Sequence, residues 1–402
     1  MKNRHIPEVR FQGFTGDWEQ RKLGDIAEIN PKSNLPEQFE YVDLESVVGT
    51  DLISHRTEHR ESAPSRAQRL AKQGDVFYQT VRPYQKNNYL FDLSYDNYVF
   101  STGYAQMRPN VDSYFLFSKL QEEKFVSSVL DRCTGTSYPA INSKDLAQIE
   151  VEIPTLGDEQ TKIGNFFKQL DDTIALHQQE LTTLKQTKQG FLQKIFPKVG
   201  ESVPEVRFPG FTGDWEQRRL GGMADFSKGN GYSKSDLTDK GKPIILYGRL
   251  YTKYETVIDS VDTFTIEKGK SVISKGDEVI IPSSGETSED ISRASVVSKP
   301  GIILGGDLNI VRPSNEIDPV FLALTISNGK QQKELSKRAQ GKSVVHLHNS
   351  DLKEVNLLFP KKEEQTQIGN FFKQLDDMIA LHQRELELLQ ETKKAFLQKM
   401  FV

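Results

Sequence analysis

The chain carries the segment EQTKIGNFFKQLDDTIALHQQELTTLKQTKQGFLQKIFP at residues 159–197 and repeats it as EQTQIGNFFKQLDDMIALHQRELELLQETKKAFLQKMFV at residues 364–402. The two copies are identical at 28 of 39 positions. Acidic residues open each copy, and carboxylates in a first turn interact favourably with the helix dipole. The repeat therefore predicts two equivalent long helices.

Apolar residues recur in both copies with alternating spacings of four and three, which is the pattern of a coiled-coil seam. At about 1.5 Å per residue, each helix is roughly 55 Å long. Two matching helices in one chain pack most economically on each other, and a two-fold relation makes them antiparallel. The predicted seam residues are Ile163, Phe167, Leu170, Ile174, Leu181, Leu184, Ile368, Phe372, Leu375, Ile379, Leu386 and Leu389.

Polar residues interrupt the seam at equivalent positions of the two copies, namely His177, Lys188, His382 and Lys393. We interpret them as positions that set the helix register, and the alternative is a partner contact or a pH-sensitive lock. Other apolar residues widen the stripe, and an exposed stripe usually marks a further partner. These residues are Phe166, Leu176, Leu192, Phe371, Leu381 and Leu397.

A shorter repeat opens each half of the chain. Residues 7–29 and 204–226 are identical at 17 of 23 positions, and the stretches that follow, about 30–153 and 227–359, are only weakly similar. Each half thus has a constant lead-in, a variable domain and a constant helix. We interpret Trp18 and Trp215 as core anchors of the lead-ins, or as groups that dock them near the helices.

The repeats predict a division of the chain into four parts. Residues 1–153 would form the first lead-in and variable domain, and residues 154–197 the central helix. Residues 198–359 would form the second lead-in and variable domain, and residues 360–402 the last helix. The expected fold class is α+β, with two α/β domains separated by two long helices in an antiparallel coiled coil, and a pseudo-two-fold internal repeat.

The composition of the chain limits the domain organisation, the cellular location and the mode of DNA binding that we expect. The 402 residues favour two or more domains, and the single cysteine, Cys133, cannot form an intrachain disulfide. No apolar signal region or membrane-spanning run is visible, so we expect a cytoplasmic protein. The net charge of −4 means that a DNA-binding function would need clustered basic residues or help from partners.

Motifs for catalysis are missing from the sequence. It has no Pro-Pro pair of the kind that DNA methyltransferase motifs contain, no P-loop and no G-x-G-x-x-G. Cys133 has no evident catalytic surroundings. We therefore predict that the chain has no catalytic activity, no cofactor and no metal site.

The paired arrangement resembles the specificity subunits of type I restriction–modification enzymes. The resemblance covers the whole chain and rests on the lead-in FQGFTGDWEQRKLG, the variable domain and the helix with EQTKIGNFFKQLD, all three of which occur twice in order. It implies that each variable domain reads one half of a bipartite double-stranded DNA target. It also implies that the constant regions bind two methyltransferase subunits, which restriction and translocation subunits later join.

Base-contact candidates in the first variable domain come from residues 54–72, 76–91 and 134–142. Arginine suits guanine edges, whereas Gln and Asn suit adenine edges. Arg82 is the leading candidate, because Arg-Pro-Tyr resembles a loop of the family's recognition domains. The alternatives are a solvated charged face for 54–72 and helix capping for 134–142. The candidates are Arg56, Arg60, Arg66, Arg69, Gln79, Arg82, Tyr84, Lys86, Asn87, Tyr138 and Asn142.

Candidates in the second variable domain come from residues 227–236, 282–294 and 341–349. The middle segment is partly acidic, which counts against close phosphate contact. His346 and His348 would share one face of a strand, and a metal site there is disfavoured because no third ligand is nearby. The candidates are Lys228, Asn230, Tyr232, Lys234, Ser283, Ser284, Thr287, Arg293, Lys342, His346 and His348.

Two other functions compete with DNA recognition. A non-catalytic adaptor would use the coiled coil to bridge proteins without reading bases. An enzyme is the second rival, and the missing motifs argue against it. Exchange of one variable domain separates these possibilities, because only a DNA-reading subunit would then change its target sequence.

Overall fold

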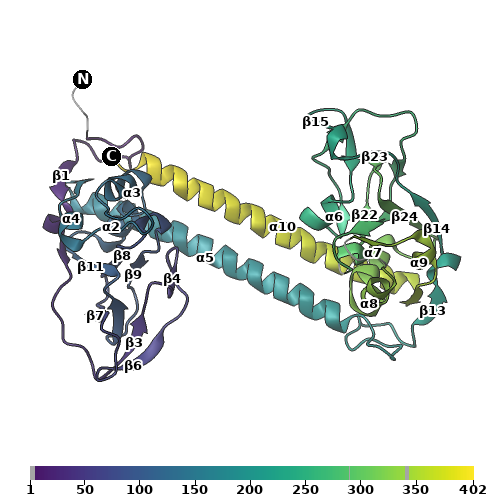
Figure 1. The fold of residues 1–402 in the computed structure, drawn as a ribbon, viewed down its shortest axis with the longest axis horizontal. Helices are drawn as coiled ribbons and strands as arrows, with labels where there is room; N and C mark the ends of the chain where they lie inside the picture. The colour runs from purple at the N-terminus through teal and green to yellow at the C-terminus, as the bar shows by residue number, and fades with distance from the viewer. Residues whose placement is uncertain (1–4, 289, 340–343) are drawn as a thin grey trace. The chain divides into compact units, whose positions relative to one another are not determined.

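A computed structural model describes residues 5–288, 290–339 and 344–402 of the protein. The chain divides into two compact units. Unit 1 comprises Met1–Gln178 and Arg384–Val402, and unit 2 comprises Gln179–Gln383. Each unit contains one lead-in, one variable domain and a part of each long helix (Figure 1).

Unit 1 is a mixed α/β body. Two of its sheets have four strands each, in the orders β2-β11-β8-β9 and β6-β3-β10-β7. All pairings in them are antiparallel except that of β3 with β10. The strands are β1 (Glu19–Lys22), β2 (Ala27–Ile29), β3 (Gln38–Val42), β4 (Val47–Val48), β5 (Asp51–Leu52), β6 (Arg56–His59), β7 (Ala67–Leu70), β8 (Val76–Gln79), β9 (Tyr89–Leu90), β10 (Tyr98–Ser101), β11 (Tyr104–Pro109) and β12 (Glu150–Ile153).

Short helices complete the variable domain of unit 1, and one end of each long helix closes it. The short helices are α1 (Leu23–Ile26), η1 (Pro83–Gln85), α2 (Ser113–Lys119), α3 (Glu123–Leu130) and α4 (Ser143–Ala147). The long helices are α5 (Gly157–Lys194) and α10 (Lys362–Lys399), which lie where the repeat predicts them.

Unit 2 repeats this plan with two five-stranded sheets, in the orders β14-β24-β20-β22-β17 and β15-β18-β16-β23-β19. Its strands are β13 (Glu216–Arg219), β14 (Ala224–Lys228), β15 (Leu237–Thr238), β16 (Lys242–Ile245), β17 (Val257–Ile258), β18 (Phe264–Thr265), β19 (Ile273–Lys275), β20 (Glu278–Pro282), β21 (Ser284–Gly285), β22 (Ser295–Val297), β23 (Pro300–Leu304), β24 (Leu308–Pro313), β25 (Val345–His346) and β26 (Asn356–Phe359). Its helices are η2 (Leu220–Gly222), η3 (Lys234–Asp236), α6 (Arg249–Thr252), η4 (Asp290–Ser292), α7 (Pro319–Ser327), α8 (Gly329–Arg338) and α9 (Asn349–Lys353).

The long helices run antiparallel in each unit. In unit 1, the first half of α5 lies beside the end of α10, and the rings of Phe166 and Phe396 are 4.9 Å apart. In unit 2, the end of α5 lies beside the start of α10, and the rings of Phe191 and Phe371 are 5.0 Å apart. The antiparallel helix pairing that the sequence predicts is therefore present in both units.

The polar seam residues pair across the helices. Lys393 forms an ion pair with Asp171 in unit 1, and Lys188 forms the same pair with Asp376 in unit 2. The histidines follow this pattern, since His177 lies 3.5 Å from Glu385 and His382 lies 3.3 Å from Glu180. Because each pair joins residues of opposite helices at one register, these contacts fit the register-setting interpretation.

Seven of the twelve predicted seam residues are buried, and the other five are half-buried. Ile163 and Phe167 lie in the core of unit 1, and Ile368 and Phe372 lie in that of unit 2. The helices are therefore parts of the domain cores as well as partners of each other. Of the residues predicted to widen the stripe, Leu176 and Leu381 are exposed, and four pack against the cores: Phe166, Leu192, Phe371 and Leu397.

Each lead-in is fixed to a long helix by a buried ion pair. Arg10 donates two hydrogen bonds, of 2.7 and 2.8 Å, to the carboxylate of Glu159, which is 1% exposed. Arg207 contacts Glu364 in the same way in unit 2. Trp18 lies in the core of unit 1 and packs edge-on against Phe401, so both interpretations of the tryptophan hold there.

Candidate nucleic-acid interface

Two candidate loops of unit 1 meet beyond the end of β8. Val81 forms a β-bridge with Ala140, and the Arg82 amide donates a 2.7 Å hydrogen bond to the Pro139 carbonyl. The Arg82 guanidinium lies over the Tyr138 ring, 4.3 Å from its centroid. Two segments that are more than fifty residues apart thus form one loop pair, with a cation stacked on an aromatic ring.

The backbone at Arg82 is strained. Its φ is +54°, and Lys86 at the other end of η1 also has φ +54°. Such a conformation costs a non-glycine residue on the order of 1–2 kcal/mol, so surrounding contacts must hold it in place. Here the bridge to Ala140 holds Arg82, and the Lys86 ammonium is bound to Glu123 at 2.7 Å and to the Gln121 carbonyl at 3.0 Å.

Several other candidates in these loops have their polar groups engaged within the protein. Gln79 is 3% exposed, and its amide donates to Val81 and Gln85. The Asn87 side chain accepts from the Gly49 amide. Asn142 caps α4, as the capping alternative for its segment expects. By contrast, the side chains of Tyr84 and Tyr138 are more than half exposed.

The arginines of residues 54–72 lie in different surroundings. Arg56 pairs with Asp43 and Glu58 and stacks on Tyr41, whereas Arg60 donates to the Leu35 carbonyl. Arg66 is exposed. Arg69 is half-buried, and its Nε atom has no hydrogen-bond partner among the described residues. The segment is therefore not one uniform charged face.

Unit 2 contains an equivalent loop pair. Strand β21 pairs with β25, which sets Ser284 opposite His346, and the Leu347 amide donates to the Ser283 carbonyl at 3.0 Å. The corresponding bond in unit 1 runs from the Ile141 amide to the Thr80 carbonyl, also at 3.0 Å. The same backbone arrangement therefore carries different side chains in the two units.

The side chains of the second loop pair differ in size and charge from those of the first. Gly285 follows Ser284 at the place where Arg82 follows Val81, and a Cβ atom there would lie 2.9 Å from the Tyr251 hydroxyl. Instead of an arginine, the exposed rings of His346 and His348 lie parallel with centroids 6.3 Å apart. The two rings therefore lie on the same side, although β25 ends at His346 and His348 caps α9.

The remaining candidates of unit 2 lie in different surroundings. Ser283 and Ser284 are buried, and Tyr232 is buried with its hydroxyl against Ser271. Thr287 and Arg293 both contact Asp290. Lys228, Asn230 and Lys234 are exposed, and the Asn230 amide donates to the Lys270 carbonyl. Lys342 lies outside the described residues.

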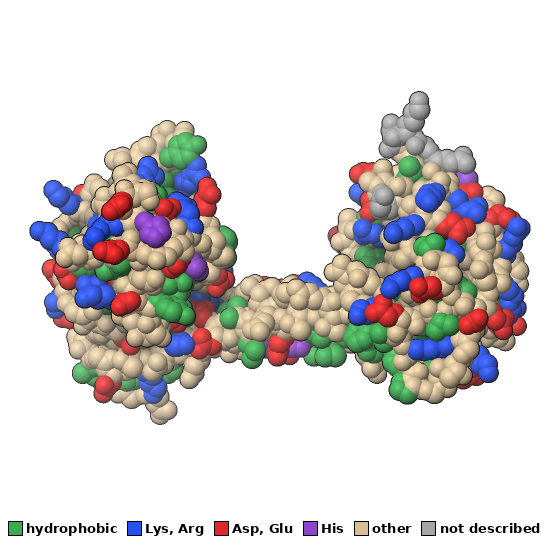
Figure 2. All heavy atoms as spheres, turned by 90° about the horizontal axis from the view of Figure 1, so that it is seen from below, with side chains coloured by type: hydrophobic (Ala, Val, Ile, Leu, Met, Phe, Trp, Pro, Cys, Tyr) green, Lys and Arg blue, Asp and Glu red, His purple; other side chains and the backbone are tan. Residues whose placement is uncertain are grey.

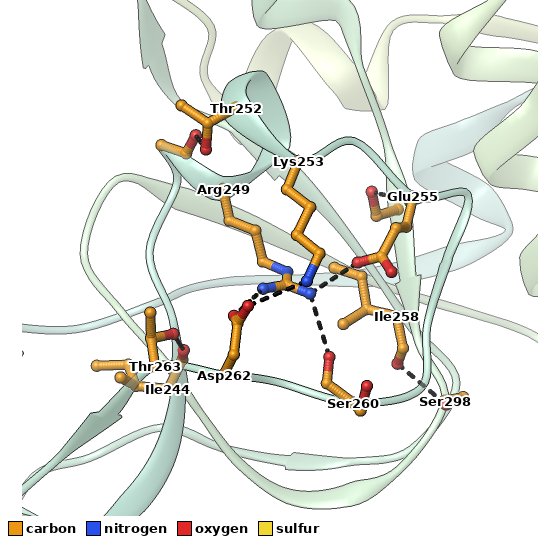
Figure 3. Close-up of polar contacts among 12 residues, drawn as sticks. Ile244, Arg249, Thr252, Lys253, Glu255, Ile258, Ser260, Asp262, Thr263 and Ser298 are labelled. Atoms are coloured by element: carbon orange, nitrogen blue, oxygen red, sulfur yellow. Dashed lines mark hydrogen bonds and ion pairs between the residues drawn. The ribbon is translucent and has the colours of Figure 1, made fainter. Parts of the chain in front are cut away.

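The buried side chain of Arg249 in α6 lies at the centre of a cluster of ion pairs and hydrogen bonds (Figure 3). Arg249 in α6 donates to Asp262 at 2.6 Å, to Glu255 at 2.7 Å and to the Ser260 carbonyl at 3.2 Å. Hydrogen bonds from Lys253 and then Arg249 lower the pKa of Asp262 to about 2. The same helix carries Tyr251, whose hydroxyl donates to the Ser284 carbonyl. The ion cluster thus fixes the helix on which β21 rests.

Charges of both signs intermingle on the visible face of each unit (Figure 2). This distribution agrees with the net charge of −4. DNA affinity in such a protein has to come from local groups of basic residues, because the face as a whole gives no strongly positive field.

Sequence reasoning identified the loop segments but missed their contacts. It did not find the stack of Arg82 on Tyr138, the pairing of β21 with β25, or the support from Arg249 and Tyr251. One signal was present, since each loop pair joins the end of a Gly-Asp strand to the segment before a capped helix. The parallel between the halves could have indicated that these segments meet.

The chain is thus a duplicated α/β protein whose two units each present a loop pair with its own side chains. Such an arrangement suits the recognition of two different surfaces. The chain belongs to the family described as Type I restriction modification DNA specificity domain, which matches residues 15–186 and 212–391. It carries two copies of a domain for DNA specificity, as the resemblance of its repeats implies.

Relatives with curated descriptions agree with this membership. The type I restriction enzyme MjaVIII specificity subunit of Methanocaldococcus jannaschii is 24% identical over 294 residues, which are 70% of this chain and 68% of the relative. The HindI specificity subunit of Haemophilus influenzae is 29% identical over 195 residues, but the match spans only 45% of this chain and 41% of the relative.

Solved structures show the same fold. The S subunit of a type I restriction–modification system from M. genitalium has a TM-score of 0.66 at 15% identity, with 99% of both chains covered. A chain from a structure on complex assembly and conformational transition of the type I R-M system has a TM-score of 0.52 at 22% identity, with 95% of this chain and 97% of that chain covered.

Among the residues described for this protein, none of the helices is long and apolar enough to cross a membrane.

Proposed function

We propose that this chain is the DNA-reading subunit of a type I restriction–modification complex, and that each variable domain reads one half of a bipartite target. The single observation that carries the proposal is the loop pair, which has the same backbone arrangement in both units and unlike side chains. Equal scaffolds with unequal side chains suit two half-sites of different sequence.

The proposed division of labour follows the repeats. Residues 1–153 and 198–359 contain the two readers, and residues 154–197 and 360–402 form the helices. Within the readers, the strongest candidates for base contact are the half-buried Arg82 and the exposed residues Tyr84, Tyr138, His346 and His348. Candidates that have internal partners, such as Gln79 and Asn142, would act by shaping the loops.

We further propose that the constant lead-ins and helices bind two methyltransferase subunits, that restriction subunits join the assembly, and that the chain itself catalyses nothing. The repeated lead-in clamps, Arg10 with Glu159 and Arg207 with Glu364, support two equivalent binding surfaces because both constant regions have the same build. The proposed location of the complex is the cytoplasm. A bridging adaptor without base readout is not favoured, since both family matches are to a DNA specificity domain.

Exchange of the first variable domain tests this function. Residues 30–153 would be replaced by the corresponding residues of another family member, and methylated motifs would be mapped across the genome of a host that carries the complex. We expect one half of the methylated sequence to change and the other half to stay the same. An unchanged motif from an assembled complex would refute the proposal.

A further inference from the structure

An open pocket lies in the first variable domain, in unit 1. It has a volume of about 630 Å³ and is lined by residues 30–35 together with Gln68 and Arg69. Two of the lining side chains, Lys32 and Arg69, are basic, and none is acidic. The pocket therefore has the charge of an anion site.

Arg69 is the unusual member of this lining. It lies on β7 opposite Phe100, is half-buried, and has no ion pair or side-chain hydrogen bond within the described part of the chain. Burial lowers the pKa of its guanidinium, which still remains charged near neutral pH. A partly desolvated cation without a counter-ion is costly, and an anion in the pocket would offset that cost.

The nearby arginines Arg56 and Arg60 already have partners within the protein. Arg56 has carboxylate partners at 2.7 and 2.8 Å. Arg60, whose guanidinium donates to the Leu35 carbonyl at the pocket rim, lies 4.0 Å from Glu37. Of these three arginines, Arg69 is the one without an ion pair or side-chain hydrogen bond among the described residues.

Hydrogen bonds connect the pocket wall to β11 and to the start of α4, which follows the second candidate loop. Asn30 begins its wall in a left-handed conformation, φ +52°, and accepts a bond from the Gln106 amide. The Asn30 side chain also donates to the Ser143 hydroxyl at 2.8 Å, and Ser143 follows directly after the loop that contains Tyr138. The Gln106 side chain donates to the Leu70 carbonyl, next to Arg69. One network therefore joins the pocket wall at Asn30 to Leu70, the residue after Arg69, and to Ser143, the residue after the second candidate loop.

We propose that this pocket holds a phosphodiester of the target DNA, with Arg69 and Lys32 as its cationic ligands, and that it sets the position of the Arg82–Tyr138 loop pair on the duplex. The inference rests on the proposed DNA-reading function. Backbone phosphates are the anions that necessarily lie beside bases being read, and phosphate contacts fix register without sequence preference. Lys32 and Asn34, which sequence reasoning did not select, belong to this site.

The test measures DNA binding by the full chain, purified with the subunits that assemble with it. Arg69→Gln and Lys32→Gln would each be compared with wild type on the methylated target duplex and on an unrelated duplex, over a series of salt concentrations. Lys124→Gln is the control, because it removes one exposed positive charge from α3, outside the pocket, the loop pair and the lead-in. Thermal melts identify any variant that fails to fold, and Lys32, being exposed, can be replaced without disturbing the core.

We expect Arg69→Gln to weaken binding about tenfold on both duplexes. The slope of log K against log salt should fall by about 0.9, which corresponds to one phosphate contact. Single phosphates of the target would also be replaced by uncharged methylphosphonates. At one position this replacement should lower the affinity of the wild-type protein, whereas Arg69→Gln should bind the modified and unmodified duplexes equally well. Inorganic phosphate should compete only weakly, because it lacks the rest of the duplex.

Three results would overturn the inference. The first is a salt dependence of binding equal to that of wild type in both folded pocket variants, and the second is a loss of discrimination at one base pair only. The third is a methylphosphonate scan in which no phosphate affects wild type and leaves Arg69→Gln unaffected. Each of them leaves the domain-exchange test intact, so failure of the pocket and failure of the proposed function can be told apart. If wild type shows no preference for its methylated target, both proposals fall.

Discussion

At the scale of single residues, Arg82 combines a flexible charged group with a fixed backbone. The left-handed φ, the bridge to Ala140 and the ring of Tyr138 together limit the positions that its guanidinium can take. An arginine that is ordered before binding loses less conformational entropy when it contacts a base. We therefore expect Tyr138 to contribute to recognition through Arg82, in addition to any contact of its own.

Substitution of these two residues should separate their roles. Arg82→Ala should relax the sequence preference at one base pair by about 1–3 kcal/mol without loss of complex assembly. Tyr138→Ala should reduce discrimination at the same base pair by about 0.5–1 kcal/mol, and Tyr138→Phe should retain it because the ring face remains. Binding to duplexes that vary one position at a time measures both effects.

A matched control is Lys124→Ala, which removes an exposed charge from α3 outside the loop pair. It should leave the preference unchanged at every position. Unaltered specificity in Arg82→Ala would remove Arg82 from the base contacts, and equal behaviour of the two Tyr138 variants would exclude the stacking role.

At the scale of elements, the long helices owe their pairing to apolar seams and their register to a few polar residues. Lys393 and Asp171 are 19% and 20% exposed, so their ion pair is screened less by water than a surface pair. Shifting one helix by a single turn would separate both lysine–aspartate pairs from their partners. The apolar residues alone would oppose such a shift less strongly than the ion pairs do. Their pattern repeats along the helix, so they could pack again in the shifted register.

A double-mutant cycle at this pair tests the register role. Lys393→Met and Asp171→Asn should each lower stability, and the coupling free energy should be about 0.5–3 kcal/mol. The exposed same-helix pair Lys168 and Asp172 is the control, and its coupling should be below about 0.5 kcal/mol. Chemical denaturation of the full chain measures both cycles, and equal coupling in the two pairs would contradict a special role for the seam pair.

At the scale of the whole molecule, duplication has kept the constant regions alike and let the variable domains diverge. The lead-in clamps are repeated bond for bond, from Arg10 with Glu159 to Arg207 with Glu364. The loop pairs are repeated in their backbone pairing only, because Gly285 stands at the place of Arg82. Constant surfaces suit one kind of partner, and divergent loops suit different bases.

Exchange of residues 227–359 should therefore alter the half of the methylated sequence that exchange of residues 30–153 leaves unchanged. A chain with both exchanges should show both changes together, because each reader acts through its own loop pair. Motif mapping of the three variants gives the answer. A change in both halves after a single exchange would mean that the two domains do not read independently.

Local patterns were enough to predict the repeated helices, their antiparallel pairing and the segments that carry the loops. The spacing of apolar residues fixes which face of a helix is buried, and prolines and acidic residues mark its ends. The resemblance of the lead-in and helix motifs to specificity subunits indicated the family, because both motifs occur twice in the same order.

Only the tertiary structure decided which candidate side chains remain available. Gln79 and Tyr84 both belong to the candidate segment 76–91, yet Gln79 turns into the protein at the end of β8 and Tyr84 stays exposed. Arg56 and Arg69 look alike in the sequence, but carboxylates meet only the first. The physical reason is that strand and loop pairing joins residues far apart in the chain, and these distant neighbours determine burial, charge partners and strain.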